Sequence, residues 1–121
     1  MLKFFVVVAG LAFSPLALAH AHLVASTPAN NATVAQAPAS LELTFSEGVE
    51  AALSQLTLVD AQGHSTSLGK LKADSAAKEA GGHRSYTVGL PALKAGEYSV
   101  KMNITSIDTH RITDTLKFSV K

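Results

Sequence analysis

The sequence predicts an all-β domain. Apolar residues alternate with polar ones along several short stretches, as in strands with one buried face. Turn-forming pairs such as Gln62-Gly63 and Ala95-Gly96 separate these stretches. Such short strands with regular breaks are typical of a β-sandwich or a β-barrel. In chain order, the apolar positions of the expected strands are Leu41, Leu43 and Phe45; Leu56 and Leu58; Tyr86, Val88 and Leu90; Tyr98, Val100, Met102 and Ile104; and Ile112, Leu116, Phe118 and Val120.

A helix is not expected to contribute to the core. Only the segment 74–80 has a composition that favours a helix, and it is too short and too uniformly rich in alanine to present an apolar stripe. We therefore expect a loop there, with at most one helical turn.

The N-terminal segment 1–19 has the order of a secretory signal peptide. Lys3 precedes an apolar run, and small residues ending at Ala19 follow it. Ser14-Pro15 interrupts the run after about ten residues, whereas a membrane-spanning helix needs roughly 20. An uncleaved anchor is the weaker alternative, so we expect export, cleavage after Ala19 and no stable membrane association afterwards.

The remaining segment, 20–121, has the length of one small domain with a single core. The chain has no cysteine, which excludes disulfides, thiolate metal sites and thiol nucleophiles. Ten Lys and Arg residues nearly balance nine Asp and Glu residues. No broad field therefore attracts nucleic acid or anionic lipid, and any partner is recognised locally.

Two places in the sequence offer metal ligands. Cleavage after Ala19 would leave His20 with a free amine beside its own imidazole, so that one residue offers two nitrogen ligands, an arrangement called a histidine brace. Asp108 and His110 would share a face if they lie in an extended strand, and could complete the site. Nitrogen and oxygen ligands in a tetragonal plane suit Cu(II).

Taken together, the chain resembles the CopC family of periplasmic copper resistance proteins over nearly the whole of 20–121. The N-terminal and C-terminal motifs hold that family's metal ligands, and the middle ones are strand and turn segments. The matching segments are His20-Ala21-His22-Leu23 with Ser26-Thr27-Pro28, Leu41-Glu42-Leu43-Thr44-Phe45-Ser46-Glu47, Leu93-Lys94-Ala95-Gly96-Glu97-Tyr98-Ser99-Val100 and Ser106-Ile107-Asp108-Thr109-His110.

The resemblance implies a small Greek-key β-sandwich, immunoglobulin-like or cupredoxin-like. It also implies a periplasmic protein of copper homeostasis that is not an enzyme and holds one Cu(II) through His20, Asp108 and His110. A CopD-type inner-membrane protein is a possible recipient of the copper. The glutamate matching Glu47 has been discussed near this copper, and its role stays open between ligand, support of a ligand, and none.

Some family members also hold Cu(I) in a methionine-rich loop. The corresponding stretch here, 60–72, contains no methionine, so we predict no Cu(I) site and place Met102 in the core. His64 and His83 each follow a glycine and are expected in loops rather than among the ligands.

His22 offers a competing way to bind copper. As the third residue of a chain that begins at His20, it completes a local peptide site made of the amine, two deprotonated amides and the His22 imidazole. If the chain enters a strand at Leu23 and Val24, these amides are committed to the sheet and the brace is favoured. His22 would then support the site or act as an auxiliary ligand.

Two other functions compete with a copper carrier. A histidine-brace copper oxygenase also begins with histidine, but it needs an open copper position and a broad substrate surface, and this chain is small and lacks tryptophan. A metal-free structural β-sandwich is the other alternative, and it predicts that His20 can be replaced without losing a Cu(II) spectrum.

Overall fold

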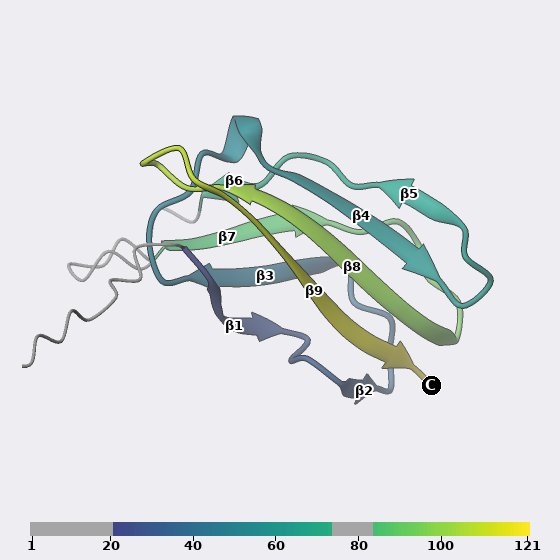
Figure 1. The fold of residues 1–121 in the computed structure, drawn as a ribbon. Coiled ribbons are helices and arrows are strands. Elements are labelled where there is room, and N and C mark those ends of the chain that lie inside the picture. The colour runs from purple at the N-terminus through teal and green to yellow at the C-terminus, as the bar shows by residue number, and fades with distance from the viewer. Residues whose placement is uncertain (1–20, 74–83) are drawn as a thin grey trace, which may run out of the picture.

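A computed structural model describes residues 21–73 and 84–121 of the chain (Figure 1). The expected signal peptide, His20 and His83, and the loop expected at 74–80, lie outside these residues. Within the described part, two β-sheets pack face to face, which confirms the predicted all-β sandwich. No helix of this part is long and apolar enough to cross a membrane.

The first sheet has four strands, all antiparallel to their neighbours, in the order β1-β3-β7-β6. The second has five, in the order β2-β9-β8-β4-β5, and only the β2–β9 pair is parallel. A single 3-10 turn, η1 (Ala51–Leu53), leads into β4. The strands are β1 (Leu23–Thr27), β2 (Ala32–Val34), β3 (Ser40–Phe45), β4 (Gln55–Asp60), β5 (Ser65–Ser67), β6 (Lys72–Ala73), β7 (Arg84–Gly89), β8 (Gly96–Thr105) and β9 (Arg111–Val120).

The core lies between the sheets and is built from the alternating residues of the long strands. Side chains of one face point inward while the intervening ones meet solvent, which is the period-two pattern of a half-buried strand. Met102 is 2% exposed, so its predicted place in the core is confirmed. The predicted residues that are buried are Leu41, Leu43, Phe45, Leu56, Leu58, Tyr86, Val88, Tyr98, Val100, Met102, Ile104, Leu116, Phe118 and Val120.

Two predicted strand positions are less regular than expected. Strand β7 ends at Gly89, so Leu90 lies just beyond it, where the residue before Pro91 is restricted in its backbone conformation. Leu90 and Ile112 are only partly buried and pack against the edge of the core.

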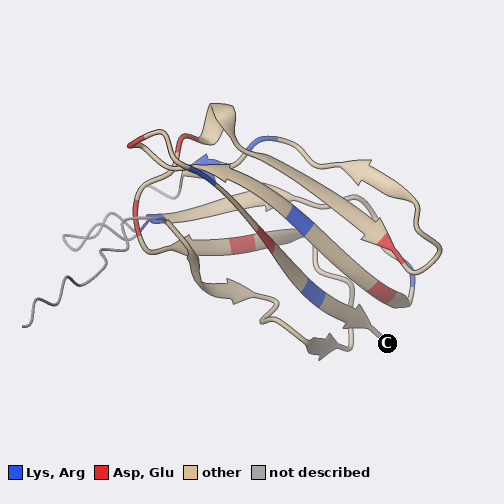
Figure 2. Ribbon diagram, in the orientation of Figure 1, with Lys and Arg blue, Asp and Glu red and all other residues tan. Residues whose placement is uncertain are grey.

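The ends of the sandwich carry the candidate functional groups. The start of β1 and the turn between β8 and β9 lie at one end, and the turn between β4 and β5, which holds His64, lies at the other (Figure 1). Charged residues of both signs are scattered over the described strands and loops (Figure 2). This distribution agrees with the balanced charge of the sequence and with recognition by local groups.

Candidate metal centre

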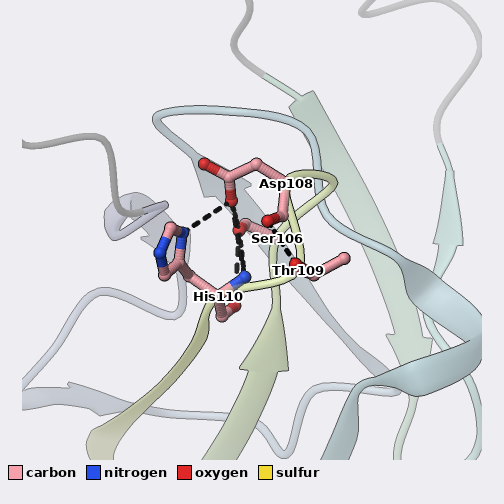
Figure 3. Close-up of polar contacts among 4 residues, drawn as sticks. All are labelled: Ser106, Asp108, Thr109 and His110. Carbon is pink, nitrogen blue, oxygen red and sulfur yellow. Dashed lines mark hydrogen bonds and ion pairs between the residues drawn. The ribbon is translucent and has the colours of Figure 1, made fainter.

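Asp108 and His110 lie together in the turn between β8 and β9 (Figure 3). The Nδ1 atom of His110 is 3.1 Å from Oδ1 of Asp108. Both side chains reach solvent, with exposed fractions of 42% for Asp108 and 56% for His110. A carboxylate oxygen and an imidazole nitrogen therefore face the same accessible volume.

These two residues do not meet in the way the sequence suggested. We expected an extended strand, in which alternation would place both on one face. Instead the segment is a tight turn: the Thr109 N–H donates to the Ser106 carbonyl (2.9 Å) and the Ser106 N–H donates to the His110 carbonyl (2.9 Å). Thr109 has φ of 71°, in the left-handed region. The predicted proximity is present, but the turn produces it.

Ser106 stabilises the turn from its buried side. It is fully buried, and its hydroxyl donates to Asp108 Oδ1 and accepts from the His110 backbone N–H (3.2 Å). The Ser106 hydroxyl first, and then the His110 imidazole, hold the pKa of Asp108 below its ordinary value, because both favour the ionised carboxylate. The carboxylate is thus kept in the form that binds a cation.

A short segment, residues 46–50, connects this turn with the N-terminal strand, and we call it the bridging segment. At its first residue, the Ser46 N–H donates to the carbonyl of His22 (2.8 Å). Further along, the Gly48 carbonyl accepts from the Ile107 N–H (3.2 Å), and Val49 forms a β-bridge with Ser106. The bridging segment therefore brings the start of β1 and the Asp108–His110 turn to one end of the sandwich.

Tyr86 of β7 fixes the middle of the bridging segment. Its hydroxyl accepts from the Val49 N–H (3.1 Å) and donates to the Val49 carbonyl (3.2 Å). Tyr86 is 3% exposed and Val49 is 6% exposed, so water has little access to these bonds. The ring also packs edge-on against Phe45, with centroids 5.9 Å apart.

Of three other residues that the sequence singled out, the structure describes Glu47 and His64 but not His20. His20 lies outside the described residues, which begin one position later with the fully buried Ala21. Glu47 is half-buried on the bridging segment. His64 lies in the β4–β5 turn, as expected of a loop histidine, with Nδ1 3.3 Å from Asp60 Oδ2.

Within 21–73 and 84–121, no three histidine or acidic side chains come together as a metal-binding cluster. Asp108 and His110 offer a pair of ligands, and a complete site needs further donors. Sequence reasoning did not identify Ser46, Tyr86 or Ser106 as supporting residues. The contacts of Ser46 and Tyr86 span 24 and 37 positions, so no local pattern marks these two residues. Ser106 lies only two positions from Asp108, and the sequence signal that could have found it is a serine next to the ligand pair.

Comparison with known proteins gives a consistent answer. The CopC domain model matches residues 23–121. Copper resistance protein C of Pseudomonas syringae pv. tomato is 40% identical over 119 residues, which cover 93% of this chain and 90% of that protein. The crystal structure of CopC from Methylosinus trichosporium OB3b superposes with a TM-score of 0.68 at 30% identity, covering 84% of this chain and 94% of that one.

A third relative is larger. Copper transport protein CutJ of Bacillus subtilis (strain 168) is 29% identical over 112 residues, which cover 91% of this chain and 20% of that protein. The names in this set describe copper resistance and copper transport proteins rather than enzymes, in agreement with the prediction that this chain is not an enzyme. On the family match and the 40% identical relative together, the chain belongs to the CopC family.

Proposed function

We propose that this protein is a periplasmic Cu(II)-binding protein of copper homeostasis and resistance. It holds one Cu(II) by the amine and imidazole of His20 together with Asp108 and His110. The observation that carries the proposal is the contact between Asp108 and His110, supported by a buried serine, at the end of the sandwich where β1 begins.

The geometry of the described pair suits two adjacent ligands of one ion. Nitrogen and oxygen ligands bound about 2.0 Å from a first-row metal, at right angles to each other, are about 2.8 Å apart. The observed separation of Nδ1 and Oδ1 is 3.1 Å. Since an ionised carboxylate only accepts hydrogen bonds, the proton of that contact is on Nδ1. A metal ion that takes the place of this proton would be bound by both groups.

The donor set favours the oxidised ion. A carboxylate and imidazole nitrogens are hard or borderline ligands, whereas Cu(I) prefers thioethers and thiolates. The described methionine, Met102, is buried in the core, away from the Asp108–His110 turn along β8. The chemistry of the residues at this end of the sandwich therefore supports Cu(II).

The proposal includes export and a recipient. Cleavage after Ala19 in the periplasm would create the amine of His20, so the site would form only in the secreted protein. The match to one fifth of CutJ supports a copper transport protein as the recipient, because in CutJ a region similar to this chain forms part of a larger copper transport protein. A CopD-type protein is the recipient that the family resemblance suggests.

Electron paramagnetic resonance tests the site. The mature protein, shown by mass to begin at His20, is titrated with Cu(II) beside His20→Ala and His110→Ala. His64→Ala is the matched control, because it removes another exposed histidine that also contacts an aspartate, at the opposite end of the sandwich.

We expect one tetragonal signal that saturates at one copper per chain, changes in both site variants and persists in the control. A signal that is unchanged in His20→Ala and His110→Ala would contradict the proposal, because copper would then be bound elsewhere, for example at the local peptide site that uses His22. A protein that gives no protein-bound Cu(II) signal would favour a metal-free sandwich. Periplasmic fractionation and the mass of the isolated protein test the cleavage site.

A further inference from the structure

We propose that Ser46 determines which copper site forms, by withholding His22 from the local peptide site. This inference rests on the proposed function, because the two sites compete only if the mature chain begins at His20. The local site uses the amine, the amide nitrogens of Ala21 and His22, and Nδ1 of His22. Two of these four donors belong to His22.

Ser46 occupies both of the His22 donors. The His22 N–H donates to Ser46 Oγ at 3.0 Å, and the Nδ1 atom of His22 lies 3.1 Å from the same oxygen. In either tautomer this contact uses Nδ1, because the nitrogen either accepts the Ser46 hydroxyl proton or donates its own proton to Oγ. A metal ion in the local site would need the Nδ1 lone pair, so it would have to break this contact in both cases.

A backbone hydrogen bond between the same two residues also holds His22 in place. The Ser46 N–H donates to the His22 carbonyl at 2.8 Å, directly beside the paired residues Leu23 and Phe45 of strands β1 and β3. Ser46 therefore binds both the backbone N–H and the backbone carbonyl of His22. A metal ion at the local site would have to break the bond from the His22 N–H to Ser46 Oγ and displace the proton of that amide to water.

Ala21 adds a separate obstacle. Its side chain is fully buried and belongs to the hydrophobic core. The local site wraps residues 20–22 around the ion, so it would have to draw Ala21 out of the core. A site that uses only the first residue and the Asp108–His110 turn leaves both Ala21 and the Ser46 contacts in place.

The expected consequence is a change of site in Ser46→Ala. Nickel(II) is the sharper probe, since it forms the same square-planar complex with deprotonated amides as copper and turns yellow in doing so. The loss of two hydrogen bonds is expected to raise the affinity of the local site for Ni(II) about tenfold or more. The yellow planar complex should appear in Ser46→Ala and disappear in Ser46→Ala/His22→Ala.

Ser85→Ala is the matched control. Ser85 lies in the same sheet and its hydroxyl contacts Thr44 Oγ1 at 2.9 Å, so this variant removes a comparable half-buried hydroxyl without touching His22. Ser46→Thr keeps a hydroxyl and should restore the behaviour of the parent protein. Equal Ni(II) spectra and affinities in the parent protein and Ser46→Ala would overturn the inference.

Amide hydrogen exchange gives a second test that needs no variant. The His22 amide of the metal-free mature protein should exchange more slowly than an unprotected peptide amide, and exchange at the unprotected rate would also overturn the inference. These tests distinguish a failure of the Ser46 inference from a failure of the proposed function. If His110→Ala leaves the Cu(II) signal of the parent protein unchanged while His22→Ala abolishes it, both proposals fail. If only the Ser46 variants behave unexpectedly, the Asp108–His110 site stands.

Discussion

Replacing Tyr86 by phenylalanine removes one hydroxyl from the interior of the sandwich and leaves the ring in place. That hydroxyl bonds both the N–H and the carbonyl of Val49. Because Val49 is 6% exposed and Tyr86 is 3% exposed, the freed backbone groups have little access to water. A buried polar group that loses its partner costs about 1–3 kcal/mol. Because two such groups are freed, we expect Tyr86→Phe to lower the free energy of unfolding by about 2–6 kcal/mol.

Tyr98→Phe provides an internal comparison. The Tyr98 hydroxyl makes the same pair of bonds, accepting from the Lys94 N–H (3.1 Å) and donating to the Lys94 carbonyl (2.7 Å). Lys94 is exposed, so water can replace the hydroxyl. Only the net value of the two hydrogen bonds is then lost, about 0.5–1.5 kcal/mol each, or about 1–3 kcal/mol together. The two substitutions are chemically identical and differ in the burial of the backbone groups that they release.

Urea unfolding and thermal melting of the two variants measure this difference. For a domain of this size, 1 kcal/mol corresponds to about 4–8 °C in Tm, so Tyr86→Phe should melt roughly 10–30 °C lower and Tyr98→Phe roughly 5–15 °C lower, about half as much. Equal losses in the two variants would refute the reasoning, since they would show that burial of Val49 does not set the cost.

Three further predictions concern the site and pH. Ser106→Ala should weaken Cu(II) binding about 10–100-fold in competition titrations, because the hydroxyl that holds Asp108 is lost; Ser26→Ala, which removes a half-buried hydroxyl bonded to the Pro28 carbonyl, should keep the parent affinity. Copper affinity should fall as the solution is made acidic, because protons compete with the metal ion for the nitrogen ligands, and a flat pH profile would contradict nitrogen ligation. The His64 backbone N–H lowers the pKa of Asp60 below 3.8. The parent should therefore be more stable than Asp60→Asn at neutral pH, and the gap should vanish as the pH falls through the lowered pKa; a gap that persists in strong acid would argue against this contact.

The strands that the sequence predicted are the long ones, in which apolar and polar residues alternate. Along β8 every second side chain from Tyr98 to Ile104 is buried, and the alternation alone marks them. The three-residue strands β2 and β5 carry no such pattern, and β6 has only two residues. These short strands exist because a neighbouring strand offers hydrogen bonds, which a single stretch of sequence does not reveal.

For the candidate site too, the sequence predicted one part and not another. The residue types at Asp108 and His110 pointed to a metal ligand pair, and their proximity is found. The turn that joins them was not foreseen, because it depends on the left-handed backbone of Thr109 and on the buried hydroxyl of Ser106. The contact between His22 and Ser46 crosses 24 positions and depends on the pairing of β1 with β3.

Because of the bridging segment, the proposed copper site depends on folding. It joins parts of the chain that come together only when the sheets have formed, so the unfolded chain has no site of the proposed kind. A protein that crosses the inner membrane unfolded would arrive without copper and would acquire it only after folding. The ion would then add to the stability of the folded state in proportion to the logarithm of its free concentration. If the chain binds copper as proposed, the abundance of its folded form rises with the free copper concentration.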